Sequence, residues 1–172
     1  MIRAYVGLGS NLDGPAQRVE RALHALAGLP QTRLASRSDL FVTAPWGVTE
    51  QPSFVNAVAA LDTALGAHDL LAALLDIERA AGRVRGTERW GPRVLDLDLL
   101  LHGELCLDEP GLQLPHPHLA ERAFVLVPLA QVAPDLDVPG YGRVVDLLAR
   151  TRSSGCRRID SPSLEPTRPG RG

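Results

Sequence analysis

Two aspartates separated by one leucine, Asp96 and Asp98, are the residues in this sequence best spaced to do chemistry. Side chains alternate along a β-strand, so both carboxylates would lie on one face, with backbones roughly 6 to 7 Å apart. Carboxylate oxygens at that separation can bind one or two hard divalent cations, of which magnesium is the natural candidate. The alternative is a solvent-facing strand with two surface aspartates, and the surrounding residues decide between the two.

Four arginines precede this pair within eleven residues: Arg83, Arg85, Arg89 and Arg93. A guanidinium group binds phosphate oxygens in a bidentate manner, and the glycines between the arginines allow the segment to move. An arginine-rich loop alone is more often a solvated face. Beside a metal-binding carboxylate pair, however, it suits phosphoryl transfer, where catalysis is mostly positioning and charge stabilisation. We therefore expect residues 82–93 to close as a lid, with Trp90 able to stack on a flat ligand.

Phe54 ends a second long irregular segment, TAPWGVTEQPSF, and lies two residues before Asn56. Both side chains would lie on the same face of a strand. There they would offer an aromatic surface beside an amide that has both donors and acceptors. The pair could hold a planar, nitrogen-rich ring. The alternative is a core phenylalanine and a cross-strand polar pair.

Three further polar residues could serve a phosphate-bearing ligand. A neutral His116 could bond a phosphate or a ribose, and Arg122 could bind phosphate, although a histidine between prolines is often only a turn residue. Glu78 would be either an ordinary exposed helix residue or a group that reaches the lid or the nucleotide. The run Gly7–Asn11, GLGSN, lacks the third glycine of a dinucleotide-binding loop, because Leu12 stands in its place. We interpret it as a turn whose backbone could line the site.

The elements that must position these residues follow a recognisable order. Strand-like runs cover residues 2–8, 33–42, 54–61 and 94–101, and amphipathic helices begin near residues 15 and 69 and end before glycines 28 and 82. The order strand, helix, strand, strand, helix, strand predicts a ferredoxin-like α+β sandwich. Its antiparallel sheet would have helices on one face and substrate loops over the other. Residues 112–132 predict a loop and a short helix, and 144–149 a last helix.

Composition limits the remaining possibilities. A chain of 172 residues with a net charge of −2 fits one domain, residues 1–149, with no overall attraction to nucleic acid or membrane. Without any lysine, a phosphate-binding loop of the GxxxxGK[ST] kind and a lysine Schiff base are both excluded. The two cysteines lack a partner at metal-ligand or redox spacing. Residues 150–172, rich in Arg, Ser, Pro and Gly, predict a disordered tail. The N-terminus does not resemble a signal peptide, so we expect a cytoplasmic protein.

Together the motifs resemble one family. RWGPRVLDLDLL is similar to the signature of 6-hydroxymethyl-7,8-dihydropterin pyrophosphokinases, and AYVGLGSNL, TAPWG, QPSFVNAV, IERAAGRVR and PHPHLAERAFVL follow the same family order. The resemblance covers roughly residues 2 to 149 and implies an enzyme of folate biosynthesis. Such an enzyme transfers pyrophosphate from ATP to the hydroxymethyl oxygen of the pterin and releases AMP. Two Mg²⁺ ions, ATP and the pterin would be its only partners, and the protein would be a monomer.

The resemblance also implies roles for individual residues. Asp96 and Asp98 would hold both metal ions, and Arg83 and Arg93 would stabilise the transferred phosphates. ATP would contact a second set of residues: Glu78, Arg85, Trp90, Leu99, His116 and Arg122. The pterin ring would stack between two phenylalanines in a third set: Thr43, Pro45, Phe54, Asn56, Trp90 and Phe124.

Two other functions are compatible with parts of the pattern. A two-metal nucleotidyltransferase would also use paired aspartates and arginines, but it would release pyrophosphate and not AMP. A ferredoxin-like RNA-binding module would use the exposed sheet face, which usually carries aromatic and basic residues. Here that face would carry two aspartates, which repel a phosphate backbone.

Overall fold

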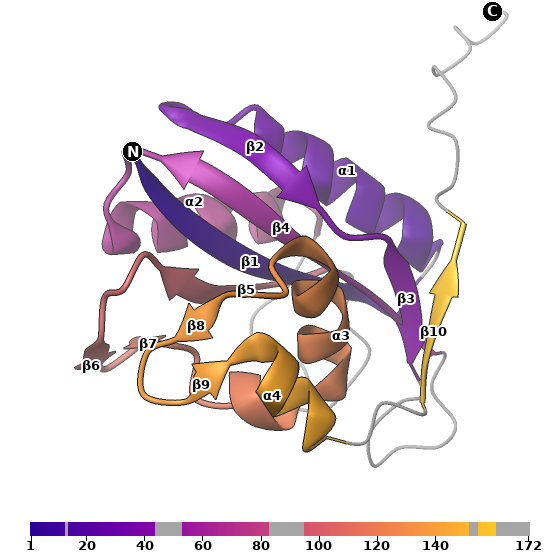
Figure 1. The fold of residues 1–172 in the computed structure, drawn as a ribbon. Coiled ribbons are helices and arrows are strands. Elements are labelled where there is room, and N and C mark those ends of the chain that lie inside the picture. The colour runs from indigo at the N-terminus through magenta and orange to yellow at the C-terminus, as the bar shows by residue number, and fades with distance from the viewer. Residues whose placement is uncertain (13, 44–52, 83–94, 152–154, 161–172) are drawn as a thin grey trace, which may run out of the picture.

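The computed structural model describes residues 1–12, 14–43, 53–82, 95–151 and 155–160. Its main sheet has the strand order β10-β3-β4-β1-β5, and β2 also pairs with β4 (Figure 1). The bounds of these strands are β1 Ile2–Ser10, β2 Thr32–Arg37, β3 Leu40–Thr43, β4 Phe54–Thr63, β5 Asp96–His102 and β10 Cys156–Ile159. All pairs are antiparallel. The predicted α+β sandwich with an antiparallel sheet is therefore confirmed.

Two long helices, α1 (Pro15–Ala27) and α2 (Ala67–Ala80), cover one face of the sheet. Gly14 has a positive φ of 66°, which suits glycine, and Pro15 follows at the first helical position, where its missing N–H costs no hydrogen bond. Apolar side chains of both helices recur at helical spacing and bury themselves against alternate residues of β1, β4 and β5. This packing forms the first core.

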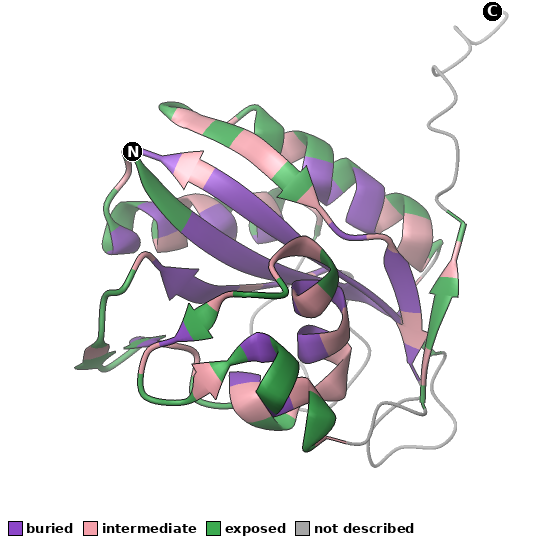
Figure 2. Cartoon of the chain, in the orientation of Figure 1, coloured by how far each residue is buried: buried purple, intermediate pink, exposed green. Residues whose placement is uncertain are grey.

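The opposite face is covered in part by helices, and not by loops alone as predicted. The 3₁₀ helix η1 (Leu119–Glu121), α3 (Ala123–Val132) and α4 (Val144–Ala149) form a second core against that face (Figure 2). Tyr5, Val58 and Leu100 are among the strand residues that they bury. These contacts are apolar, whereas Gln131 of α3 donates from Nε2 to the Asp39 carboxylate beside β3. None of the helices described is long and apolar enough to cross a membrane.

Several short elements differ from the predictions. The run predicted as one strand over 33–42 is split into β2 and β3 by Ser38, whose backbone N–H and side-chain oxygen both bond β4 at Val58. The run Gly7–Ser10 continues β1 and does not form the predicted turn. Two small hairpins were not predicted: β6 (Leu107–Glu109) with β7 (Leu112–Leu114), and β8 (Asp137–Val138) with β9 (Gly142–Arg143).

The predicted tail contains an ordered strand. β10 pairs with β3, its Ile159 packs against the first core, and the Arg158 guanidinium lies 3.2 Å from the Asp39 carboxylate. The prediction of disorder is wrong for Cys156–Ile159, because an edge strand is held by backbone bonds that composition does not reveal. Cys156 is half-buried, whereas the other cysteine, Cys106, is exposed immediately before β6. Residues 152–154 and 161–172 lie outside the described residues.

If β10 is part of the cooperative fold, Ile159→Ala should lower the free energy of unfolding by about 1 to 2 kcal/mol. In a chain of this size that corresponds to a fall in melting temperature of about 2 to 8 °C. Arg157→Ala, at the exposed position two residues earlier, is the control and should stay within about 0.5 kcal/mol of the parent. Equal melting curves for both variants would mean that β10 does not stabilise the domain.

Candidate active site

The acidic pair lies where strand alternation predicts. Asp96 and Asp98 are half-buried at the start of β5, while Leu95, Leu97 and Leu99 are buried in the first core on the helix side. Beyond Leu99 the register with β1 shifts by one residue, so that Leu100 and Leu101 both reach the second core. The two carboxylates therefore lie just outside the apolar cover of their face of the sheet.

Glu78 holds the backbone of this strand in place. It is only 2% exposed, and its Oε1 accepts a hydrogen bond of 2.7 Å from the backbone N–H of Leu97, the residue between the two aspartates. Among the strands that the structure describes, β5 lies at the edge of the sheet, and none of them pairs with that N–H on its outer side. The reading of Glu78 as an ordinary exposed residue is wrong. Contact with ATP stays a prediction.

His116 is fixed next to the acidic strand. Its backbone N–H donates to the carbonyl of Leu100 at 2.9 Å, and its Nδ1 accepts from the N–H of His118 at 3.2 Å. Burial lowers the pKa of His116 to about 4, aided by the charges of Arg122 and His118 and opposed by that of Asp96. The ring is thus neutral at pH 7. Because Nδ1 is the acceptor, Nε2 carries the proton and can donate.

The lowered pKa of His116 sets the direction of a pH effect. Since the folded-state pKa lies below the ordinary value of 6.5, folding favours the neutral ring. Its contribution to stability is complete above pH 6.5 and is lost as the pH falls towards 4. We expect NMR titration of the ring to leave His116 neutral at pH 5.5, below the ordinary histidine pKa of 6.5. A His116 midpoint near 6.5 would contradict the burial argument.

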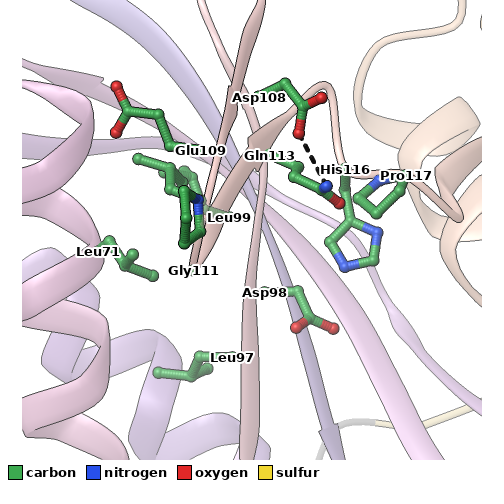
Figure 3. Close-up of a pocket in the computed structure, with 12 residues that line it drawn as sticks. Leu71, Leu97, Asp98, Leu99, Asp108, Glu109, Gly111, Gln113, His116 and Pro117 are labelled. Atoms are coloured by element: carbon green, nitrogen blue, oxygen red, sulfur yellow. Dashed lines mark hydrogen bonds between the residues drawn. The ribbon is translucent and has the colours of Figure 1, made fainter.

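A pocket of about 620 Å³ opens beside Asp98 (Figure 3). Leu71 projects from α2 on one side, and Asp98 and His116 lie on the other. The hairpin β6–β7 closes a third side, with Gln113 donating from Nε2 to the Asp108 carboxylate at 2.9 Å. The full lining is Leu71, Leu97, Asp98, Leu99, Asp108, Glu109, Pro110, Gly111, Leu112, Gln113, His116 and Pro117. Three predicted residues, Asp98, Leu99 and His116, therefore share one pocket.

Sequence reasoning missed the hairpin wall and Leu71. A signal was present, because Pro110 and Gly111 separate two short alternating runs, and Gly111 adopts the positive φ of 84° that such a turn favours. That signal predicts a hairpin, but it does not say that the hairpin folds back over β5. The exposed pair His68 and Glu109, 2.7 Å apart, connects the hairpin to the start of α2.

Four of the predicted ring-binding residues lie on β3, β4 and the first turn of α3: Thr43, Phe54, Asn56 and Phe124. Asn56 and Thr43 are buried, and the Nδ2 of Asn56 donates to the Oγ1 of Thr43 at 2.9 Å. Phe54 is half-buried opposite Thr43, and so is not a core residue. Phe124 is the second residue of α3, with the Arg122 guanidinium carbon 5.5 Å from its ring centre. The alternative reading was a core phenylalanine beside a cross-strand polar pair. The polar pair exists, as Asn56 and Thr43, but Phe54 does not belong to the core.

The acidic strand and the amide strand flank β1. Gly9 pairs with Asp96 on one side and with Asn56 on the other, so these three residues form one row across the sheet. Adjacent strands lie about 4.8 Å apart, which sets the backbones of Asp96 and Asn56 roughly 10 Å apart on the same face. That spacing suits two ligands that meet above β1.

The described residues can supply part of a metal site. They contain no cluster of three or more histidine, cysteine, aspartate or glutamate side chains suited to an ion. Two carboxylates on one face fit Mg²⁺ nevertheless, because this ion is commonly held by one or two carboxylates together with substrate phosphates and water.

Some of the predicted site residues lie outside the described residues, and their roles stay predictions: Pro45, Arg83, Arg85, Trp90 and Arg93.

Residues 5–134 match the family model of 7,8-dihydro-6-hydroxymethylpterin-pyrophosphokinase. The chain belongs to this family. The chain is 52% identical over 157 residues to the 2-amino-4-hydroxy-6-hydroxymethyldihydropteridine pyrophosphokinase of Pseudomonas aeruginosa, covering 91% of this chain and 96% of the relative. It is 47% identical over 160 residues to the protein of the same name from Methylorubrum extorquens, covering 93% and 100%.

The fold of this pyrophosphokinase also matches a solved structure. A crystal structure of Plasmodium falciparum HPPK-DHPS wild type with pteroate superimposes with a TM-score of 0.70 at 11% identity. The match covers 87% of this chain and 44% of that one, and at this identity it supports the fold alone. The family, the pyrophosphokinase activity and the place in folate biosynthesis expected from the sequence are confirmed, and the enzyme is an ATP-using kinase.

Proposed function

We propose that this enzyme holds two Mg²⁺ ions on Asp96 and Asp98 and binds its two substrates on either side of them. The row formed by Asp96, Gly9 and Asn56 carries the proposal, because it sets the acidic strand and the amide strand on one face with only β1 between them. The metal, when bound, would neutralise the phosphate charge and polarise the phosphorus that is attacked. The chain itself would position the two substrates and exclude water.

ATP would occupy the pocket beside Asp98. Leu71, Leu97 and Leu99 offer an apolar wall for the base. The neutral ring of His116 would donate from Nε2 to a ribose or phosphate oxygen without adding a charge. By the family resemblance, Arg122, Glu78 and the lid residues Arg83, Arg85, Trp90 and Arg93 would complete the nucleotide site. The pocket supplies the apolar surface and the donor that this arrangement needs.

The pterin would lie at the opposite end of the row. Asn56 would bond the heterocycle edge from the position that Thr43 fixes, and the ring would stack between Phe54 and Phe124. Pro45 and Trp90 would complete this pocket by the resemblance. The hydroxymethyl group would then point across β1 towards Asp96.

In the reaction, the hydroxymethyl oxygen attacks the β-phosphorus of ATP. A new oxygen–phosphorus bond forms, the bond from that phosphorus to the α,β-bridging oxygen breaks, and AMP leaves with the bonding electrons. The hydroxyl proton passes to water or to Asp98. The protein would act as a monomer in the cytoplasm, with no nucleic acid or membrane partner.

One incubation tests the proposal. The purified chain is mixed with ATP, MgCl₂ and 6-hydroxymethyl-7,8-dihydropterin, and the nucleotide products are separated by chromatography. We expect AMP in amounts equal to the pterin diphosphate, and no product after EDTA treatment. Release of pyrophosphate in place of AMP would indicate the nucleotidyltransferase alternative, and undiminished turnover in EDTA would exclude the metal site.

A further inference from the structure

Gly9 lies in the middle of the row between Asp96 and Asn56, and the proposed function gives it no contact with either substrate. Gly9 lies inside β1, and its φ is not among the positive values, so its backbone conformation suits any L-residue. Glycine in the interior of a strand weakens the strand and often marks a place where another group approaches closely. Here that group can be identified.

A side chain at position 9 would collide with Asn56. A Cβ built on Gly9 would lie 2.9 Å from the Oδ1 of Asn56, closer than a carbon and an oxygen ordinarily approach without a bond. The same construction at Gly7, two residues earlier on the same face, gives 3.6 Å to the side chain of Leu100, which is an ordinary contact. Of these two glycines, Gly9 is the one whose missing side chain leaves room for Asn56.

The Asn56 side chain is restrained on the flank away from position 9. Its Nδ2 is bonded to the Oγ1 of Thr43 on the other flank, and the residue is only 6% exposed. The amide thus spans from β3 across β4 to the space above Gly9. Because the same amide carries both atoms, a shift of Oδ1 away from a Cβ at position 9 would also move Nδ2 and strain the buried hydrogen bond to Thr43.

We propose that Gly9 is a positioning residue of the pterin site, since the absence of a side chain lets the Asn56 amide lie across β1. The proposal rests on the proposed function, in which Asn56 binds the pterin. It also explains why β1, the strand between the two substrates, carries no side chain at this row. Gly9 acts through Asn56 and touches neither ATP nor its metal.

Gly9→Ala should raise the KM for the pterin about tenfold, because an amide displaced by a fraction of an ångström no longer meets the ring edge. The KM for ATP should stay within about twofold of the parent. Gly7→Ala is the matched control and should leave the pterin KM unchanged. Pterin binding measured by calorimetry without ATP should show the same tenfold loss for Gly9→Ala, which separates positioning from a catalytic defect.

A double-mutant cycle with Asn56→Ala decides the cause. If Gly9 acts through Asn56, adding Gly9→Ala to Asn56→Ala leaves the pterin KM unchanged. An equal tenfold rise in both backgrounds would overturn the proposal. If Asn56→Ala alone has no effect on the pterin KM, the proposed pterin site fails instead.

The cycle also covers the case in which Gly9→Ala does not fold. The double variant must then fold, because it lacks the colliding amide. Failure of both to fold would also overturn the proposal.

Discussion

Asp96→Asn and Asp98→Asn should each lower kcat on the order of 10³-fold, which corresponds to about 4 kcal/mol of transition-state stabilisation. Each substitution keeps the shape of the side chain and removes the charge that a divalent cation requires. Steady-state rates at saturating ATP and pterin, measured over a range of MgCl₂ concentrations, test this. The half-saturating magnesium concentration should rise in both variants.

The control for the loss of one carboxylate is Asp69→Asn, an exposed aspartate in the first turn of α2. It removes the same charge outside the site and should leave kcat and the magnesium dependence unchanged. Circular dichroism and melting curves of the two site variants should match those of the parent. A site variant with normal kcat and an unchanged magnesium profile would contradict the assignment of these residues to the metal.

Asn56→Ala should lower kcat/KM for the pterin about 10²-fold, or about 2.7 kcal/mol, almost entirely through KM. The substitution removes the amide that would bond the heterocycle, and it leaves the Oγ1 of the buried Thr43 without the donor that it has in the structure. Because Asn56 lies two strands from β5, the KM for ATP should not change. Initial rates with each substrate varied in turn separate the two constants.

A change in the KM for ATP would contradict the assignment of Asn56 to the pterin site. If both KM values rose together, Asn56 would support the whole sheet face and not one substrate. Thr43→Val offers an intermediate case, since it removes the partner of Asn56 but keeps the amide itself. Its pterin KM should lie between those of the parent and Asn56→Ala.

The parts of the fold with strong periodicity could be predicted from the sequence. The alternation of aspartate and leucine over residues 95–99 predicts both the strand and the face on which the acids lie. Side chains alternate between the two faces, so once the leucines are buried the aspartates must lie on the opposite face. The helical spacing of α1 and α2 likewise predicted their buried sides. The family motifs then predicted that residues far apart in the sequence would meet.

Other features depend on contacts that a linear pattern does not contain. The sequence does not predict β10, because Ile159 is the one aliphatic residue of this strand in an arginine-rich stretch and pairing with β3 is a backbone property. The bond from Glu78 to the N–H of Leu97 joins a helix to an edge strand nineteen residues away. Gly9 was read as part of a turn because the sequence does not show that Asn56 occupies the space of its missing side chain.

The two cysteines differ in a way that experiments can use. Burial raises the pKa of the Cys156 thiol, so at neutral pH this sulfur stays protonated and reacts slowly, whereas Cys106 is exposed just ahead of the hairpin that lines the pocket proposed for ATP. A brief treatment with a maleimide dye should therefore label Cys106 first. The fluorescence of the labelled Cys106 would then report ATP binding in the native chain, without any engineered residue.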